Sequence, residues 1–235
     1  MAVETLSYTL SLGARAVGSQ VLKTTVTPRV VTLELRALFQ GALGQHSLTQ
    51  TSQVAADTGE SLRFREEDDA KGDKRVFEVV FDPRSGLVRA TRQAGGQQGE
   101  AETPLLRPYS DPLGLLYRVR ELARGGVEKP VRVAMLGKDV VIEPLGEQAL
   151  ETPQGERRAL GYLLNPGLGY VFIDAEPPHA PLRFVQPTVH GHVEAFLVRA
   201  VQEEGATVVA PPQNSERGSK RRRRGGRRRR RVEAG

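Results

Sequence analysis

The stretch VHGHVEAF holds two of the four histidines of the chain. On an extended strand, His190, His192 and Glu194 would point to one face, because side chains alternate along a strand. Imidazole nitrogens bind zinc, which could activate water in a metal-dependent hydrolase, but no spacing rule brings a third histidine close. A polar strand face without metal is the favoured interpretation, so neither a metal site nor a cofactor is predicted.

Four carboxylates, Glu66 to Asp69, crowd together before the sequence AKGDKR. Paired carboxylates can exchange protons in catalysis or bind a hard cation. Their position between two apolar stretches, next to Gly72, instead favours a solvated hairpin loop. Its charge would also discourage edge-to-edge aggregation.

Arg118 and Arg120 could bind a carboxylate or phosphate of a ligand through paired hydrogen bonds. We give more weight to a structural ion pair of one of them with Glu121 or with a carboxylate of a sheet. Tyr117 is expected to pack its ring in the core with its hydroxyl satisfied. Tyr117 and Arg120 are the ligand-binding candidates outside the C-terminal tail.

The sequence contains none of the common catalytic motifs. The chain has no cysteine, which excludes disulfides, thiolate catalysis and cysteine-ligated metals. NPGLGY lacks the Lys-Ser/Thr pair of a P-loop and the spacing of a dinucleotide fingerprint, and no Gly-x-Ser-x-Gly elbow occurs. No catalytic residue is predicted, and we expect a protein that is not an enzyme.

Basic charge is concentrated at the C-terminal end of the chain. Residues 213–235 carry eleven positive and two negative side chains, a net charge of +9. Residues 1–212 carry 23 positive and 26 negative side chains, a net charge of −3. On charge alone, this larger part has no basic surface suited to a phosphate backbone.

The run KRRRRGGRRRRR repels itself too strongly to fold alone, so residues 205–235 are predicted to be a disordered linker and arginine-rich tail. Each guanidinium can hold a phosphate through two hydrogen bonds. Without aromatic rings or a groove-reading framework, the tail would bind the backbone of RNA or DNA without sequence specificity. Acidic proteins, anionic lipid headgroups, polyphosphate or a nuclear-import receptor are the alternatives. The predicted nucleic-acid-binding residues are Arg217, Lys220, Arg221, Arg222, Arg223, Arg224, Arg227, Arg228, Arg229, Arg230 and Arg231.

Short alternating stretches dominate residues 1–204. In the first, Leu6, Tyr8 and Leu10 alternate with serine and threonine, as in a strand with one apolar face. Similar stretches recur about every eight to twelve residues, which is typical of an antiparallel sheet or barrel. We predict a mainly β domain over residues 1–204, with about a dozen strands in a curved antiparallel sheet or half-barrel. AGGQQGEAETPLL is expected to be a flexible loop.

One segment has helical periodicity instead. Ser110 or Asp111 can cap a helix, and Pro112 suits its first turn. Gly125 and Gly126 can end it. The predicted central helix covers about residues 111–124, with an apolar stripe formed by Leu115, Val119 and Leu122.

This helix resembles the Asp-x-Leu-x-x-Leu-Tyr-x-x-Arg segment of the bacterial domain-of-unknown-function family 3108. The matching positions are Asp111, Leu113, Leu116, Tyr117 and Arg120. LSYTLSLGARAVGS and LETPQGERRALGYLL are similar to the opening strand and to a late hairpin of that family, and the order fits most of residues 4–200. The resemblance implies a lipoprotein-carrier-like half-barrel, in which a concave apolar face holds acyl chains. It implies no established activity.

These observations favour a non-enzymatic bacterial binding protein. Its β domain would bind a partner or small ligand, and its tail would anchor it to nucleic acid. The alternatives are a carrier of lipid or another hydrophobic ligand, and the metal-dependent hydrolase. The first residues, MAVETLSYTLSLG, do not read as a secretory signal, and no apolar stretch is long enough to span a membrane, so the cytoplasm is the expected location.

Overall fold

The computed structural model describes residues 1–70, 72–135 and 137–204, which form one antiparallel sheet of fourteen strands, together with one α-helix and one short 3-10 helix. The strands before the α-helix are β1 (Ala2–Leu12), β2 (Arg15–Val26), β3 (Val30–Phe39), β4 (His46–Ala55), β5 (Ser61–Ala70), β6 (Asp73–Asp82), β7 (Leu87–Ala94) and β8 (Gln97–Pro104). The 3-10 helix η1 (Gly41–Leu43) lies between β3 and β4. After α1 (Pro112–Arg124) come β9 (Val131–Met135), β10 (Lys138–Thr152), β11 (Gly155–Asn165), β12 (Gly169–Asp174), β13 (Pro181–Thr188) and β14 (Gly191–Glu204).

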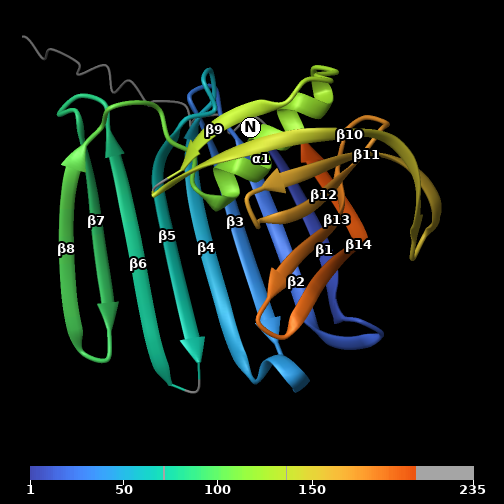
Figure 1. Cartoon of the computed structure of the whole chain (residues 1–235), viewed down its shortest axis with the longest axis horizontal. Helices are drawn as coiled ribbons and strands as arrows, with labels where there is room; N and C mark the ends of the chain where they lie inside the picture. Colours follow the sequence, from blue (N-terminus) through green and yellow to red (C-terminus); the bar gives the residue numbers. More distant parts are fainter. Residues whose placement is uncertain (71, 136, 205–235) are drawn as a thin grey trace, which may run out of the picture.

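The sheet curls so that its two halves face each other across α1 (Figure 1). Neighbours in the sequence are hairpin partners, and β1 also pairs with β14, so the first and last strands lie side by side within the sheet. From the edge strand β8 the chain passes through α1 to β9 at the opposite edge. A curled sheet of this length follows from the twist that accumulates over many strands. The predicted mainly β half-barrel with one central helix is confirmed.

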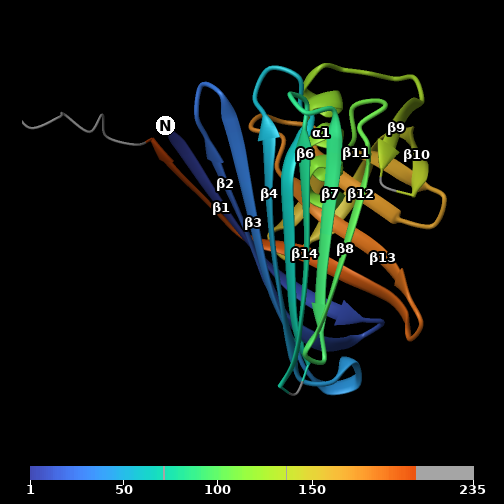
Figure 2. The ribbon, with the colours of Figure 1, turned by 90° about the vertical axis from the view of Figure 1, so that its left-hand side faces the viewer.

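The segment before α1 links the two halves of the sheet. The backbone N–H of Ser61 in β5 donates to the carbonyl of Tyr109 at 3.0 Å, and the N–H of Ser110 donates to the carbonyl of Ala134 in β9 at 2.8 Å. Two consecutive residues thus connect β5 to β9, while β6 to β8 continue beyond this link as an extension of the sheet (Figures 1 and 2).

The core lies on the inner face, where the alternation predicted it. Leu6, Tyr8 and Leu10 of β1 are buried, whereas Thr9 is exposed. Buried apolar side chains from both halves of the sheet and from α1 form one cluster. A smaller cluster, Val79, Phe81 and Val88, lies on the extension formed by β6 to β8.

The prediction of a flexible loop over residues 94–106 was wrong, because residues 97–104 form β8. Gly95 and Gly96 have φ values of 55° and 77°, the left-handed conformation of a two-residue hairpin turn. Every residue of β8 is exposed, so no apolar alternation marks this strand in the sequence. Its pairing with β7 holds it in the sheet.

The prediction that Glu66 to Asp69 form a hairpin loop was also wrong, because all four residues lie inside β5. Partners on the same and neighbouring strands surround two of the four carboxylates: Gln50 of β4 donates to Glu66 at 2.6 Å, and cations on β5 and β6 contact Glu67. The carboxylate of Glu67 forms ion pairs with Nη2 of Arg65 and Nζ of Lys74, each with an N–O distance of 2.6 Å. Lys74, which follows the acidic run in the sequence, therefore supplies a cross-strand partner for Glu67.

Candidate functional site

The first turn of α1 is fixed to the sheet through Asp111. One oxygen of this buried carboxylate accepts from the backbone N–H groups of Leu113 and Gly114, at 2.9 and 2.8 Å. The other accepts from the hydroxyls of Ser52 in β4 and Ser61 in β5, each at 2.6 Å. Burial raises the pKa of Asp111, and these hydrogen bonds oppose the rise. The predicted cap is confirmed, and it also docks the helix on two strands.

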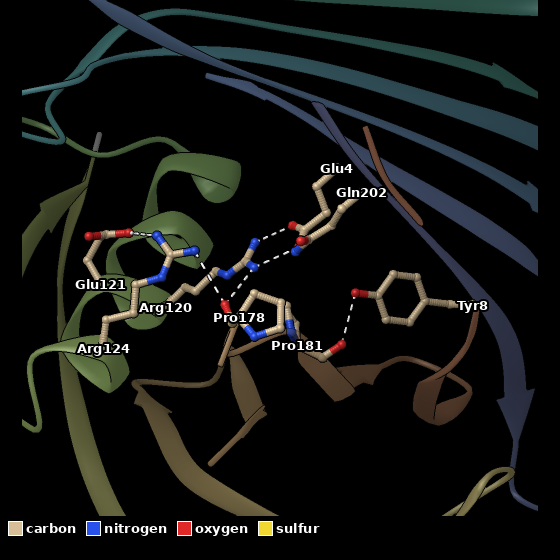
Figure 3. A network of polar contacts seen from close by, with 8 residues as sticks. All are labelled: Glu4, Tyr8, Arg120, Glu121, Arg124, Pro178, Pro181 and Gln202. Atoms are coloured by element: carbon tan, nitrogen blue, oxygen red, sulfur yellow. Dashed lines mark hydrogen bonds and ion pairs between the residues drawn. The ribbon is translucent and has the colours of Figure 1, made fainter. Parts of the chain in front are cut away.

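The second half of α1 is fixed through Arg120 (Figure 3). Its guanidinium forms a buried ion pair with Glu4 of β1, with Nη2 at 2.8 Å from Oε1. Nη2 also donates to the carbonyl of Pro178 at 2.9 Å, and Gln202 of β14 donates to Glu4 at 3.3 Å. Burial alone would raise the pKa of Glu4, but the hydrogen bonds and charge of Arg120 bring it below the ordinary value. Nearby, the Tyr8 hydroxyl donates to the carbonyl of Pro181 at 3.0 Å.

Arg120 forms an ion pair with a carboxylate of the sheet, that of Glu4. This contact agrees with the structural interpretation of the helix arginines. Arg118 donates to the carbonyl of Thr58 at 3.0 Å. Tyr117 is half-buried against the core. Neither Tyr117 nor Arg120 lines the cavity described next, and a ligand contact by either stays a prediction.

A cavity of about 160 Å³ lies between the first half of α1 and the inner face of the sheet. The helix contributes Pro112, Leu113, Leu115 and Leu116, Leu168 lies in the turn between β11 and β12, and strands of both halves of the sheet contribute the rest. Asp111 fixes the first turn of α1 and Arg120 fixes its second half, so the helix holds its leucines above this mainly apolar space. The wall comprises Leu10, Gln20, Leu35, Ala37, Phe39, Leu48, Gln50, Pro112, Leu113, Leu115, Leu116, Leu164, Leu168, Tyr170, Val171, Phe184, Gln186, Val193 and Ala195.

Three glutamines interrupt this apolar wall: Gln20 of β2, Gln50 of β4 and Gln186 of β13. Each lies two residues from an inward-facing apolar side chain, as Gln186 does from Phe184. Gln20 and Gln50 are half-buried and Gln186 is exposed. These three glutamines were not among the predicted site residues. The signal available in the sequence was a polar residue at the inward position of an alternating strand.

The proposed histidine face is only partly formed. His190 lies in the turn before β14, and His192 and Glu194 lie on that strand. Glu194 forms an ion pair with Arg183, with an N–O distance of 2.7 Å. Within the described ranges, no group of three histidine or acidic side chains is arranged to hold a metal ion.

The arginine candidates, from Arg217 to Arg231, lie outside the described residues together with the rest of the predicted linker and tail. For the residues that the structure does describe, no helix has the length and apolar character needed to cross a membrane.

The curled antiparallel sheet and its helix define a class of β-barrel-like proteins. The chain resembles a solved structure described as a beta-barrel-like protein of domain of unknown function DUF1849 from Brucella abortus. The identity is 11%, the TM-score is 0.56, and the match covers 87% of this chain and 99% of the other. The sequence model described as "Protein of unknown function (DUF3108)" matches residues 7–198, and the chain belongs to this family. No curated protein matches the chain.

Proposed function

We propose that the protein is a non-enzymatic binding protein that carries a hydrophobic ligand in the cavity beneath α1. The observation that supports this is an open space of about 160 Å³ with fifteen wholly apolar residues in its wall. Protein interiors are normally packed without voids larger than a water molecule. Apolar cavities of roughly 150 Å³ stay dry and bind benzene or xenon. The present space is open and its mainly apolar wall includes three glutamines, so it favours an occupant with an apolar part.

The cavity volume sets the size of the buried group. An occupant comparable to benzene corresponds to about six carbon atoms. A longer chain would keep its remaining part at the mouth, where Tyr170 is 40% exposed. The proposed ligand is therefore a small apolar compound or one end of an acyl chain.

Benzene is a rigid probe of this proposal. Titration of the full chain, followed by methyl NMR, should shift Leu35, Leu115 and Leu164 selectively. Ala37→Leu should abolish these shifts, because Ala37 lines the cavity and the added methyl groups would occupy it. Ala101→Leu, on the exposed strand β8, is the matched control and should leave them unchanged. Absence of shifts in the unmodified chain, or their persistence in Ala37→Leu, would contradict the proposal.

A second candidate function is supported by the composition of residues 213–235, with their net charge of +9. In this proposal, the tail binds the phosphate backbone of RNA or DNA without sequence preference. The two functions are compatible, because the part that precedes the tail has a net charge of −3 and its cavity is apolar. In this proposal the protein is located in the cytoplasm, where RNA and DNA are accessible to the tail.

A further inference from the structure

The three cavity glutamines have hydrogen-bonding capacity that the protein does not use fully. A carboxamide has two N–H donors and an acceptor oxygen. Gln50 donates from Nε2 to Glu66 at 2.6 Å, which leaves its oxygen available. Among residues 1–70, 72–135 and 137–204, no side-chain hydrogen bond of Gln20 or Gln186 is present. Gln20 is half-buried and Gln186 is exposed, so solvent reaches these amides, and a ligand head that both accepts and donates would replace it without loss of hydrogen bonds.

The same wall contains no charged side chain among the described residues. An ionised ligand head entering it would lose water without gaining a partner of opposite charge. A ligand carboxylate at Gln50 would also be repelled by Glu66, because Gln50 donates a hydrogen bond to that side chain. An ammonium group in the cavity would not meet Glu66 directly, because Glu66 does not line the cavity. Glu66 lies instead in a second hollow, together with Asp68, Arg75 and Arg92.

We infer that the ligand is an amphiphile with an uncharged head that donates and accepts hydrogen bonds, such as an alcohol or a primary amide. Its apolar end lies among the leucines of α1, and its head contacts the amide of at least one of Gln20, Gln50 and Gln186. This inference rests on the proposed function, since it assigns the chemical class of the ligand in the same cavity.

Three probes of equal chain length separate the possible heads: octanol, octanoate and octylammonium, each titrated at neutral pH into the full chain by calorimetry. Octanol should bind at least about tenfold more tightly than either ion, because the ions must be desolvated without a counter-charge. Equal or tighter binding of octanoate or octylammonium would overturn the inference and leave the hydrophobic cavity in place. If none of the three binds while benzene does, the inference fails and the proposed function stands; if benzene does not bind either, the proposed function fails as well.

The glutamines are tested by Gln20→Leu and Gln186→Leu. Either change makes the wall more apolar, so the informative quantity is the affinity for octanol divided by the affinity for benzene. This ratio should fall about threefold to tenfold when one hydrogen bond to the hydroxyl is lost. Gln53→Leu, at an exposed position of β4 outside the cavity wall, is the matched control. A ratio that stays unchanged in both cavity variants would show that the amides do not contact the head.

Discussion

Single polar residues fix α1 in place. Glu4 and Arg120 are 9% and 7% exposed, and their ion pair joins the helix to the middle of the sheet. The arginine has further hydrogen-bond partners in Pro178 and the glutamate in Gln202. Both terminal nitrogens of Arg120 are bonded, whereas its buried Nε has no hydrogen-bond partner among the described residues. Removing either member of such a buried pair is costly, because the remaining charge would be left without compensation.

Glu4→Gln should therefore destabilise the protein by about 3–5 kcal/mol at neutral pH. Urea unfolding of the full chain measures this change. Glu102→Gln removes the exposed partner of Arg89 and should have no measurable effect, as expected for surface pairs. If the two variants behave alike, Arg120 and Glu4 do not hold the helix.

The same pair predicts a pH dependence. The pKa of Glu4 is lower in the folded than in the unfolded chain, so between these values the unfolded chain binds more protons. The contribution of Glu4 is then complete above its unfolded pKa and is lost as the pH falls through the folded pKa. The stability difference between the unmodified chain and Glu4→Gln should shrink progressively below about pH 4.5. A difference that is constant or grows on acidification would contradict this assignment.

At the scale of elements, α1 approaches the sheet closely because position 114 is glycine. A Cβ atom there would lie 2.8 Å from Oγ of Ser61, which is itself bonded to Asp111. On a free helix, alanine would be more stable than glycine by about 1 kcal/mol. Gly114→Ala should instead cost about 1–3 kcal/mol through overpacking, as measured by thermal unfolding. A more stable variant would show that α1 is not docked at this distance.

The edge strand β8 and the internal strand β1 should differ in stability. All of β8 is exposed and pairs only with β7, whereas β1 lies between β2 and β14 and contributes to the core. Backbone amides of β8 should therefore exchange with deuterium much faster than those of β1. Comparable protection in the two strands would indicate that β8 is covered by another surface.

At the scale of the whole molecule, period-two alternation and helix capping predicted the fold class, because inward residues such as Leu6 are apolar and Asp111 caps α1. The alternation could not reveal β8, which buries no side chain. It also could not assign Glu66 to a strand, because the partners of the acidic run come from its own strand and from both neighbouring strands, β4 and β6. The cavity wall combines residues from distant strands, such as Gln20 and Gln186, so only the folded sheet brings them together.

The tail should act independently of the cavity. A chain ending at Ala210 should lose affinity for labelled RNA and DNA. If about eight charges of the full chain engage phosphates on duplex DNA, log affinity should fall with log salt at a slope near −7. A full-length chain with every arginine of residues 220–231 changed to serine is the control for length. Unchanged binding after truncation would contradict a role of the tail.

The most direct test of the central claim is a crystal structure of the full chain grown with octanol. We expect electron density for the alkyl chain among Leu35, Leu115 and Leu164, with the hydroxyl directed toward a glutamine amide of the wall. A space filled by protein side chains, or octanol found only outside the cavity, would show that the cavity beneath α1 does not bind this ligand.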